Sequence, residues 1–125
     1  MTITGILAPL VESIKRRFFK WEDQFFARRF GLELGPVCRE DLVSDDAESS
    51  AHANACQAVW CRNLREIFKE TRKFDAIPKN FVDIGSGKGK ACFFAATKMP
   101  FEKIIGVEFS KPLVLVAEAN AARLG

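Results

Sequence analysis

The residues best suited to chemistry lie in one short stretch, FVDIGSGKGK, at positions 81–90. Asp83 follows the apolar residues at 81–82, and glycines then occupy the alternate positions 85, 87 and 89. Glycines let the backbone turn sharply and allow a ligand to approach the main chain closely. A carboxylate followed by such a loop predicts a binding site for a small molecule.

A second carboxylate belongs to the same prediction. Glu108 follows the next apolar run, 19 residues after Gly89. An acidic side chain at the end of a strand can accept hydrogen bonds from both hydroxyl groups of a ribose. A glycine loop together with such a carboxylate indicates a cofactor that contains a nucleoside.

The surrounding pattern predicts the elements that position these residues. Residues 80–85 and 102–109 are typical of buried strands, and 88–99 of a helix between them. Ser110 is expected to cap a further helix. The connection is long enough for a right-handed crossover between parallel strands. Ligands of open parallel sheets bind beyond the carboxyl ends of the strands, where both carboxylates are then expected.

Two classes of nucleotide site fit the loop poorly. A triphosphate-binding loop needs G-x-x-x-x-G-K followed by Ser or Thr. The first glycine position holds Ile84 or Val82 in the two possible registers, and Ala91 or Gly89 follows the lysine. An NAD(P)-binding oxidoreductase fragment is the other alternative.

A dinucleotide site needs a small third residue where this chain has Lys90. Asp83 would repel a pyrophosphate but suits an ammonium group. Lys88 and Lys90 are themselves expected to be solvated residues at the start of the helix.

S-adenosylmethionine fits better, since it has a ribose, a sulfonium cation and an amine but no phosphate. The segments VDIGSGKG and GVEFS resemble the first two motifs of class I S-adenosylmethionine-dependent methyltransferases. The first is also similar to the corresponding segment of non-SET histone-lysine methyltransferases. The resemblance covers about 80–125 and implies an α/β fold. It would be a Rossmann-like parallel sheet, incomplete and preceded by N-terminal helices.

The resemblance also implies a set of cofactor-binding residues: Asp83, Gly85, Ser86, Gly87, Gly89, Glu108 and Phe109. Asp83 would approach the methionine amine, directly or through water, and the glycines would form the floor of the site. Glu108 would bind the ribose hydroxyls, and Phe109 would contact adenine. No catalytic residue and no methyl acceptor, whether protein or small molecule, can be named.

The remaining sequence divides into an N-terminal amphipathic helix (1–35) and a linker with a second helix (36–79), before the cofactor-binding half (80–125). The second helix is expected at about 53–71. In the first helix, apolar residues recur at steps of four and three, and Gly31 is a plausible end. This stripe consists of Leu7, Val11, Ile14, Phe18, Trp21 and Phe25. We expect it to pack on the main body or on a second copy; the alternative is a basic, aromatic surface for a membrane or a partner.

Composition limits the other possibilities. The chain has 125 residues, of which 48% are hydrophobic and 28% charged, and its net charge of +3 is too small to indicate nucleic acid. No apolar run is long enough to span a bilayer. The four cysteines form no C-x-x-C pair and indicate reduced thiols in a cytoplasmic protein rather than a metal site.

The number of strands raises a further expectation. The family fold that the motifs resemble has a seven-stranded sheet, whereas this sequence predicts two strands. We therefore expect either a missing C-terminal half or self-association, and this chain alone would show little or no turnover. The rival function from another class is a non-catalytic interaction module that uses the N-terminal aromatic helix.

Overall fold

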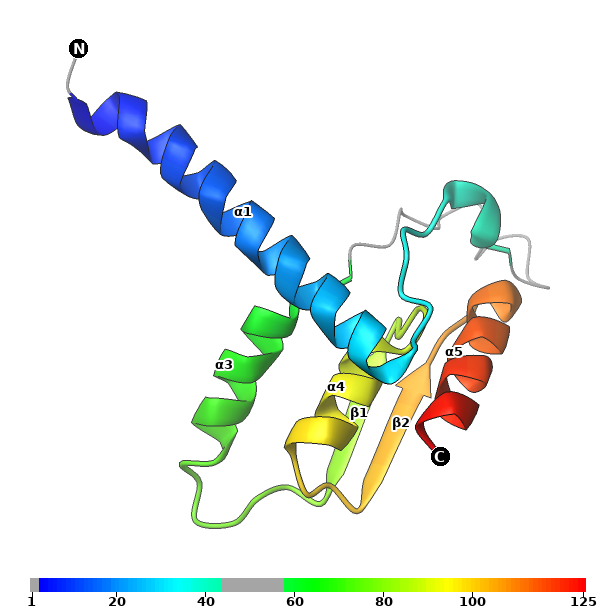
Figure 1. The fold of residues 1–125 in the computed structure, drawn as a ribbon. Helices are drawn as coiled ribbons and strands as arrows, with labels where there is room; N and C mark the ends of the chain where they lie inside the picture. The colour runs from blue at the N-terminus through cyan, green and yellow to red at the C-terminus, as the bar shows by residue number, and fades with distance from the viewer. Residues whose placement is uncertain (1–2, 44–57) are drawn as a thin grey trace.

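The computed structural model describes residues 3–43 and 58–125. Within them the fold is α/β, with a two-stranded parallel sheet and four α-helices (Figure 1). In chain order the elements are α1 (Ile3–Phe30), the 3-10 helix η1 (Arg39–Asp41), α3 (Cys61–Thr71), β1 (Asn80–Ile84), α4 (Lys90–Lys98), β2 (Lys103–Val107) and α5 (Lys111–Leu124).

The sheet confirms the predicted strand–helix–strand unit. β1 and β2 pair in parallel, in a register that joins Asn80 to Lys103 at one end and Ile84 to Val107 at the other. Figure 1 shows α4 running along the strands in front of β1, with α3 on one side of it and α5 on the other. The face of β1 that carries Val82 is turned away from the helices, and Val82 is 53% exposed.

The core lies between the helices and the sheet and is largely aromatic. Phe68 of α3 stacks on Phe94 of α4, and Phe26 of α1 meets the same Phe94 ring edge-on at 5.2 Å. Phe81 of β1 and Phe101 complete the cluster against Phe68. Ring pairs of this kind contribute about 0.5–1.5 kcal/mol each beyond the burial of their area. Three helices are therefore fixed to one strand by a single set of rings.

Helix α1 ends as predicted at Gly31, which has a positive φ of 65°, but it packs through a different face. Phe26 is 5% exposed, whereas Phe18 and Trp21 of the apolar stripe are 52% and 58% exposed. The expectation that the stripe packs on the main body is therefore wrong for the described side chains. The spacing of the six stripe residues correctly indicates an apolar face on this helix. The residue of α1 that is buried in the core, however, is Phe26, which lies on another face.

Helix α3 begins later than predicted. Residues 44–57 lie outside the described part of the chain, and Ala58 to Trp60 are not helical. The first helical N–H group, that of Cys61, donates to the Asp23 carboxylate of α1 at 2.9 Å. A side chain distant in sequence thus takes the place of a local cap, which no local pattern could reveal.

Ser110 occupies the N-cap position of α5, as the sequence predicts, but its hydroxyl does not cap the helix. The hydroxyl donates instead to the carbonyl oxygen of Asp41 in η1. Ser110 is fully buried, so this contact fixes η1 against the start of α5. In the part of the chain that the structure describes, no helix is both long enough and apolar enough to cross a membrane.

Candidate functional site

The glycine loop connects the carboxyl end of β1 to the start of α4. Gly85 and Gly89 have φ values of 76° and 87°, in the left-handed region that favours glycine. A β-carbon at Gly89 would lie 2.6 Å from the Phe93 ring, whereas one at Gly85 would meet nothing within 4 Å. Gly89 is therefore required for packing, and Gly85 faces open space.

Asp83 lies near the end of β1, in register with Gly106 of β2. Burial raises the pKa of its carboxyl above the usual range, and the negative charge on Glu108 raises that pKa further. The structure thus brings the two predicted carboxylates close enough to interact. Because Glu108 disfavours the charge on Asp83, the end of the sheet is suited to a positively charged group.

Glu108 also makes two contacts that the sequence did not predict. One carboxylate oxygen accepts a hydrogen bond from the Gly87 N–H at 2.7 Å, and the other accepts from the Ser110 N–H at 2.9 Å. These bonds hold the glycine loop against the end of β2. Each oxygen keeps a further lone pair, so the carboxylate can still accept from a hydroxyl group.

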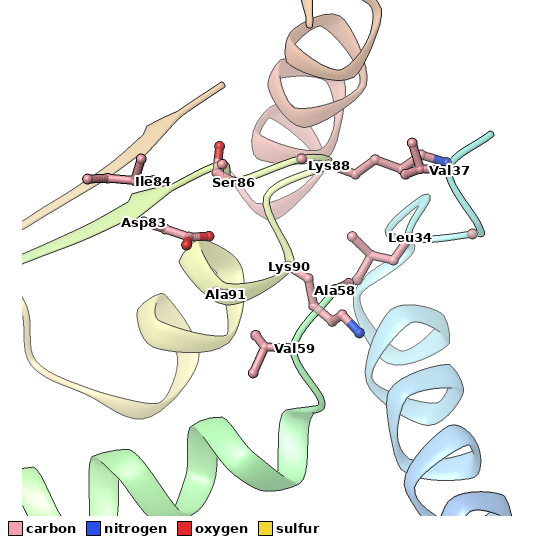
Figure 2. Close-up of a pocket in the computed structure, with 13 residues that line it drawn as sticks. Leu34, Val37, Ala58, Val59, Asp83, Ile84, Ser86, Lys88, Lys90 and Ala91 are labelled. Atoms are coloured by element: carbon pink, nitrogen blue, oxygen red, sulfur yellow. The ribbon is translucent and has the colours of Figure 1, made fainter. Parts of the chain in front are cut away.

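A cavity of about 210 Å³ opens beside the loop (Figure 2). Asp83 lies on one wall, and Leu34 and Val59 lie across from it, so the connector after α1 and the segment before α3 both contribute. The cavity also includes Gly85, Ser86 and Gly87 from the predicted set. Lys88 and Lys90 line the cavity as well, so the Asp83 carboxylate shares this hollow with two lysines.

Two other predicted residues line a second, more open groove of about 700 Å³. Gly89 and Glu108 contribute to it together with α5, and Ser86 belongs to both hollows. Phe109 lines neither of them and is 43% exposed. Asp83 lines the smaller cavity and Glu108 lines the groove. A ligand that contacted both carboxylates would therefore extend from the cavity into the groove past Ser86.

Lys88 and Lys90 are not solvated, contrary to expectation. The Lys88 side chain is 13% exposed and pairs with Glu33 at 2.9 Å, and the Lys90 side chain is 11% exposed and pairs with Asp23. Both partners come from α1 or the residues that follow it, at least 55 positions away in the sequence. Such distant pairing gives no local signal.

Asn120 of α5 is a supporting residue that the sequence analysis missed. Its side chain is fully buried, and its carbonyl oxygen accepts from the Glu33 N–H at 2.8 Å. Its amide nitrogen donates to the carbonyl oxygens of Glu33 at 3.0 Å and Lys88 at 3.2 Å. One side chain thus connects α5, the connector after α1 and the glycine loop. A lone Asn on an apolar helix face was the only available signal.

Two cysteines close to the site are buried and unsuited to nucleophilic chemistry. Burial raises the pKa of Cys61 to about 12 and that of Cys92 to about 11, so both thiols stay protonated near neutral pH. Among the described residues, no three His, Cys, Asp or Glu side chains are grouped to hold a metal ion.

Comparison with protein families and known proteins adds no relative: no family model, no curated protein and no solved structure matches this chain.

Proposed function

We propose that this chain binds S-adenosylmethionine in the service of methyl transfer, as a class I, Rossmann-like methyltransferase domain. The observation that carries the proposal is the meeting of Asp83 and Glu108 at the ends of adjacent parallel strands, on either side of a glycine loop. The pair favours a cationic ligand, and a strand-end carboxylate suits a ribose.

The state of the loop lysines also supports a cofactor without phosphate. Phosphate-binding loops present N–H groups at the start of a helix, and triphosphate-binding loops add a lysine that reaches the phosphates. Here the charges of Lys88 and Lys90 are compensated by Glu33 and Asp23. The nearest uncompensated charge in the cavity is the carboxylate of Asp83, which would repel a pyrophosphate.

In this proposal Asp83 binds the methionine amine within the smaller cavity, and the ribose lies over the loop toward Glu108. Ser86 and the three loop glycines form the floor between them, and adenine would contact Phe109, which is exposed directly after Glu108. Methyl transfer is an in-line displacement at the sulfonium, to which a protein contributes mainly position and electrostatics. The acceptor is not specified.

The test is a side-by-side calorimetric titration with S-adenosylmethionine, its demethylated product and NAD. We expect the first two to bind more tightly than NAD. The variant Glu108→Ala should weaken their binding by about 1–3 kcal/mol, the range for hydrogen bonds to a charged group. Glu66→Ala is the matched control, because Glu66 is exposed on α3 and lines neither hollow. Equal or tighter binding of NAD would overturn the proposal.

A further inference from the structure

Helix α1 has an apolar surface that nothing in the described chain covers. Its outer stripe consists of Val11, Ile14, Phe18, Trp21 and Phe25, each between 47% and 59% exposed. The Trp21 ring lies 5.8 Å from that of Phe18 and 5.7 Å from that of Phe25, so the three rings form one continuous surface. Figure 1 shows the N-terminal half of α1 extending away from the rest of the protein.

The body of the protein is attached to a different side of α1. Phe26 is buried in the core, and Asp23 contacts both α3 and Lys90 of α4. With 3.6 residues per turn, neither residue falls on the outer stripe. The outer stripe can therefore meet a flat surface while the sheet and the candidate site remain in water.

The charges of α1 determine what kind of surface fits. Its carboxylates are already paired: Glu12 with Arg16, Glu22 with Arg65 and Asp23 with Lys90. The cations that border the outer stripe are exposed. The helical repeat places Arg17 and Arg28 along one border, and Lys15 and Arg29 along the other.

This pattern disfavours a second copy of the chain as the occupant. Two outer stripes brought together would face each other with basic borders, and like charges that flank a helical seam destabilise it. A bilayer with anionic headgroups offers an apolar region and negative charge at once. Helices that carry aromatic residues on one face and Lys or Arg beside them lie in the plane of such a surface.

We propose that α1 docks on anionic lipid bilayers through its outer stripe, with Phe18, Trp21 and Phe25 at the depth of the headgroups and the basic borders on the lipid phosphates. The helix lies on the membrane and does not cross it. This proposal is independent of what the glycine loop binds.

The test is co-sedimentation of the whole chain with vesicles of phosphatidylcholine alone or with one third phosphatidylglycerol. We expect binding only to the anionic vesicles, and weaker binding as salt is raised. In a Trp60→Phe background, the fluorescence of Trp21 should shift to shorter wavelength when these vesicles are added.

Two variants separate the apolar and the charged contributions. Phe18→Ser with Phe25→Ser, and Arg17→Glu with Arg28→Glu, should each lower the partition onto anionic vesicles by roughly tenfold or more. Leu115→Ser is the matched control, because Leu115 of α5 is 60% exposed but lies outside α1. Circular dichroism establishes that each variant keeps its helix content.

Three results would overturn the proposal. They are no binding to anionic vesicles, equal binding to neutral ones, or unchanged binding by both double variants. The chain could instead fail to bind vesicles and form a dimer in ultracentrifugation. If the Phe18 and Phe25 substitutions then convert that dimer to a monomer, the outer stripe binds a second copy of the chain.

Discussion

Replacing Asn120 with leucine removes the connection between α5 and the glycine loop while keeping the number and branching of the side-chain heavy atoms. The change leaves the N–H and carbonyl groups of Glu33 and the carbonyl of Lys88 without their present partner. Each lost hydrogen bond costs about 0.5–1.5 kcal/mol, and an unsatisfied buried group costs more. Since these groups are only partly buried, water can replace some of the bonds. We expect the free energy of unfolding to fall by about 2–4 kcal/mol.

Urea denaturation followed by circular dichroism measures this loss directly. Asn63→Leu is the control, because Asn63 lies exposed on α3 and its replacement should change stability by less than about 0.5 kcal/mol. Asn120→Asp keeps the acceptor for the Glu33 N–H but loses both donors, so it should not restore stability. If Asn120→Leu were as stable as the control, the three hydrogen bonds would not support the fold, and the role assigned to Asn120 would be wrong.

Three further perturbations address the loop, the carboxylate pair and the uncovered face of the sheet. Gly89→Ala should destabilise the fold by about 1–3 kcal/mol in urea denaturation, because its φ is positive and its β-carbon would meet the Phe93 ring; a neutral effect would contradict this. Asp83→Asn should flatten the pH dependence of stability. The raised pKa means that the native state binds more protons, so wild-type stability falls as pH rises through that pKa; a fall unchanged in the variant would exclude Asp83 as its source. Val82→Lys should reduce self-association in ultracentrifugation relative to the exposed control Leu115→Lys, because parallel sheets are normally covered on both faces. A wild-type chain that is monomeric at all concentrations would refute that expectation.

Local sequence was sufficient for the strand–loop–helix unit, because its constraints are local. The strand β1, the sharp turn that the glycines allow and the length of the crossover all depend on neighbouring residues. The parallel pairing of β1 with β2, and the position of Glu108 at the end of β2, followed from the same pattern. These features were predicted from the sequence and are confirmed by the structure.

The contacts that assemble the site around that unit were not predictable in the same way. Lys88 bonds to Glu33 across 55 positions and Lys90 to Asp23 across 67. The sequence alone does not distinguish these two carboxylates from the other Asp and Glu residues as partners for the lysines. Which face of α1 packs on the body also depends on tertiary contacts. Phe26 is buried while the more regular outer stripe is exposed, and spacing along the helix does not distinguish the two faces. The start of α3 at Cys61 depends on Asp23 for the same reason.

The two carboxylates at the end of the sheet are an electrostatically unfavourable pair, and they lie where the proposed ligand would bind. Asp83 is partly buried beside a second carboxylate, an arrangement that disfavours the ionised form and lowers the stability of the unliganded protein near neutral pH. Side chains elsewhere in the site do the opposite: Glu33 and Asp23 each compensate a lysine, and Asn120 satisfies three backbone groups. This local conflict between two carboxylates is of the kind that concentrates where ligands bind. A cation between Asp83 and Glu108 would remove the conflict, so the same electrostatics that lower stability would favour binding of a sulfonium and an amine.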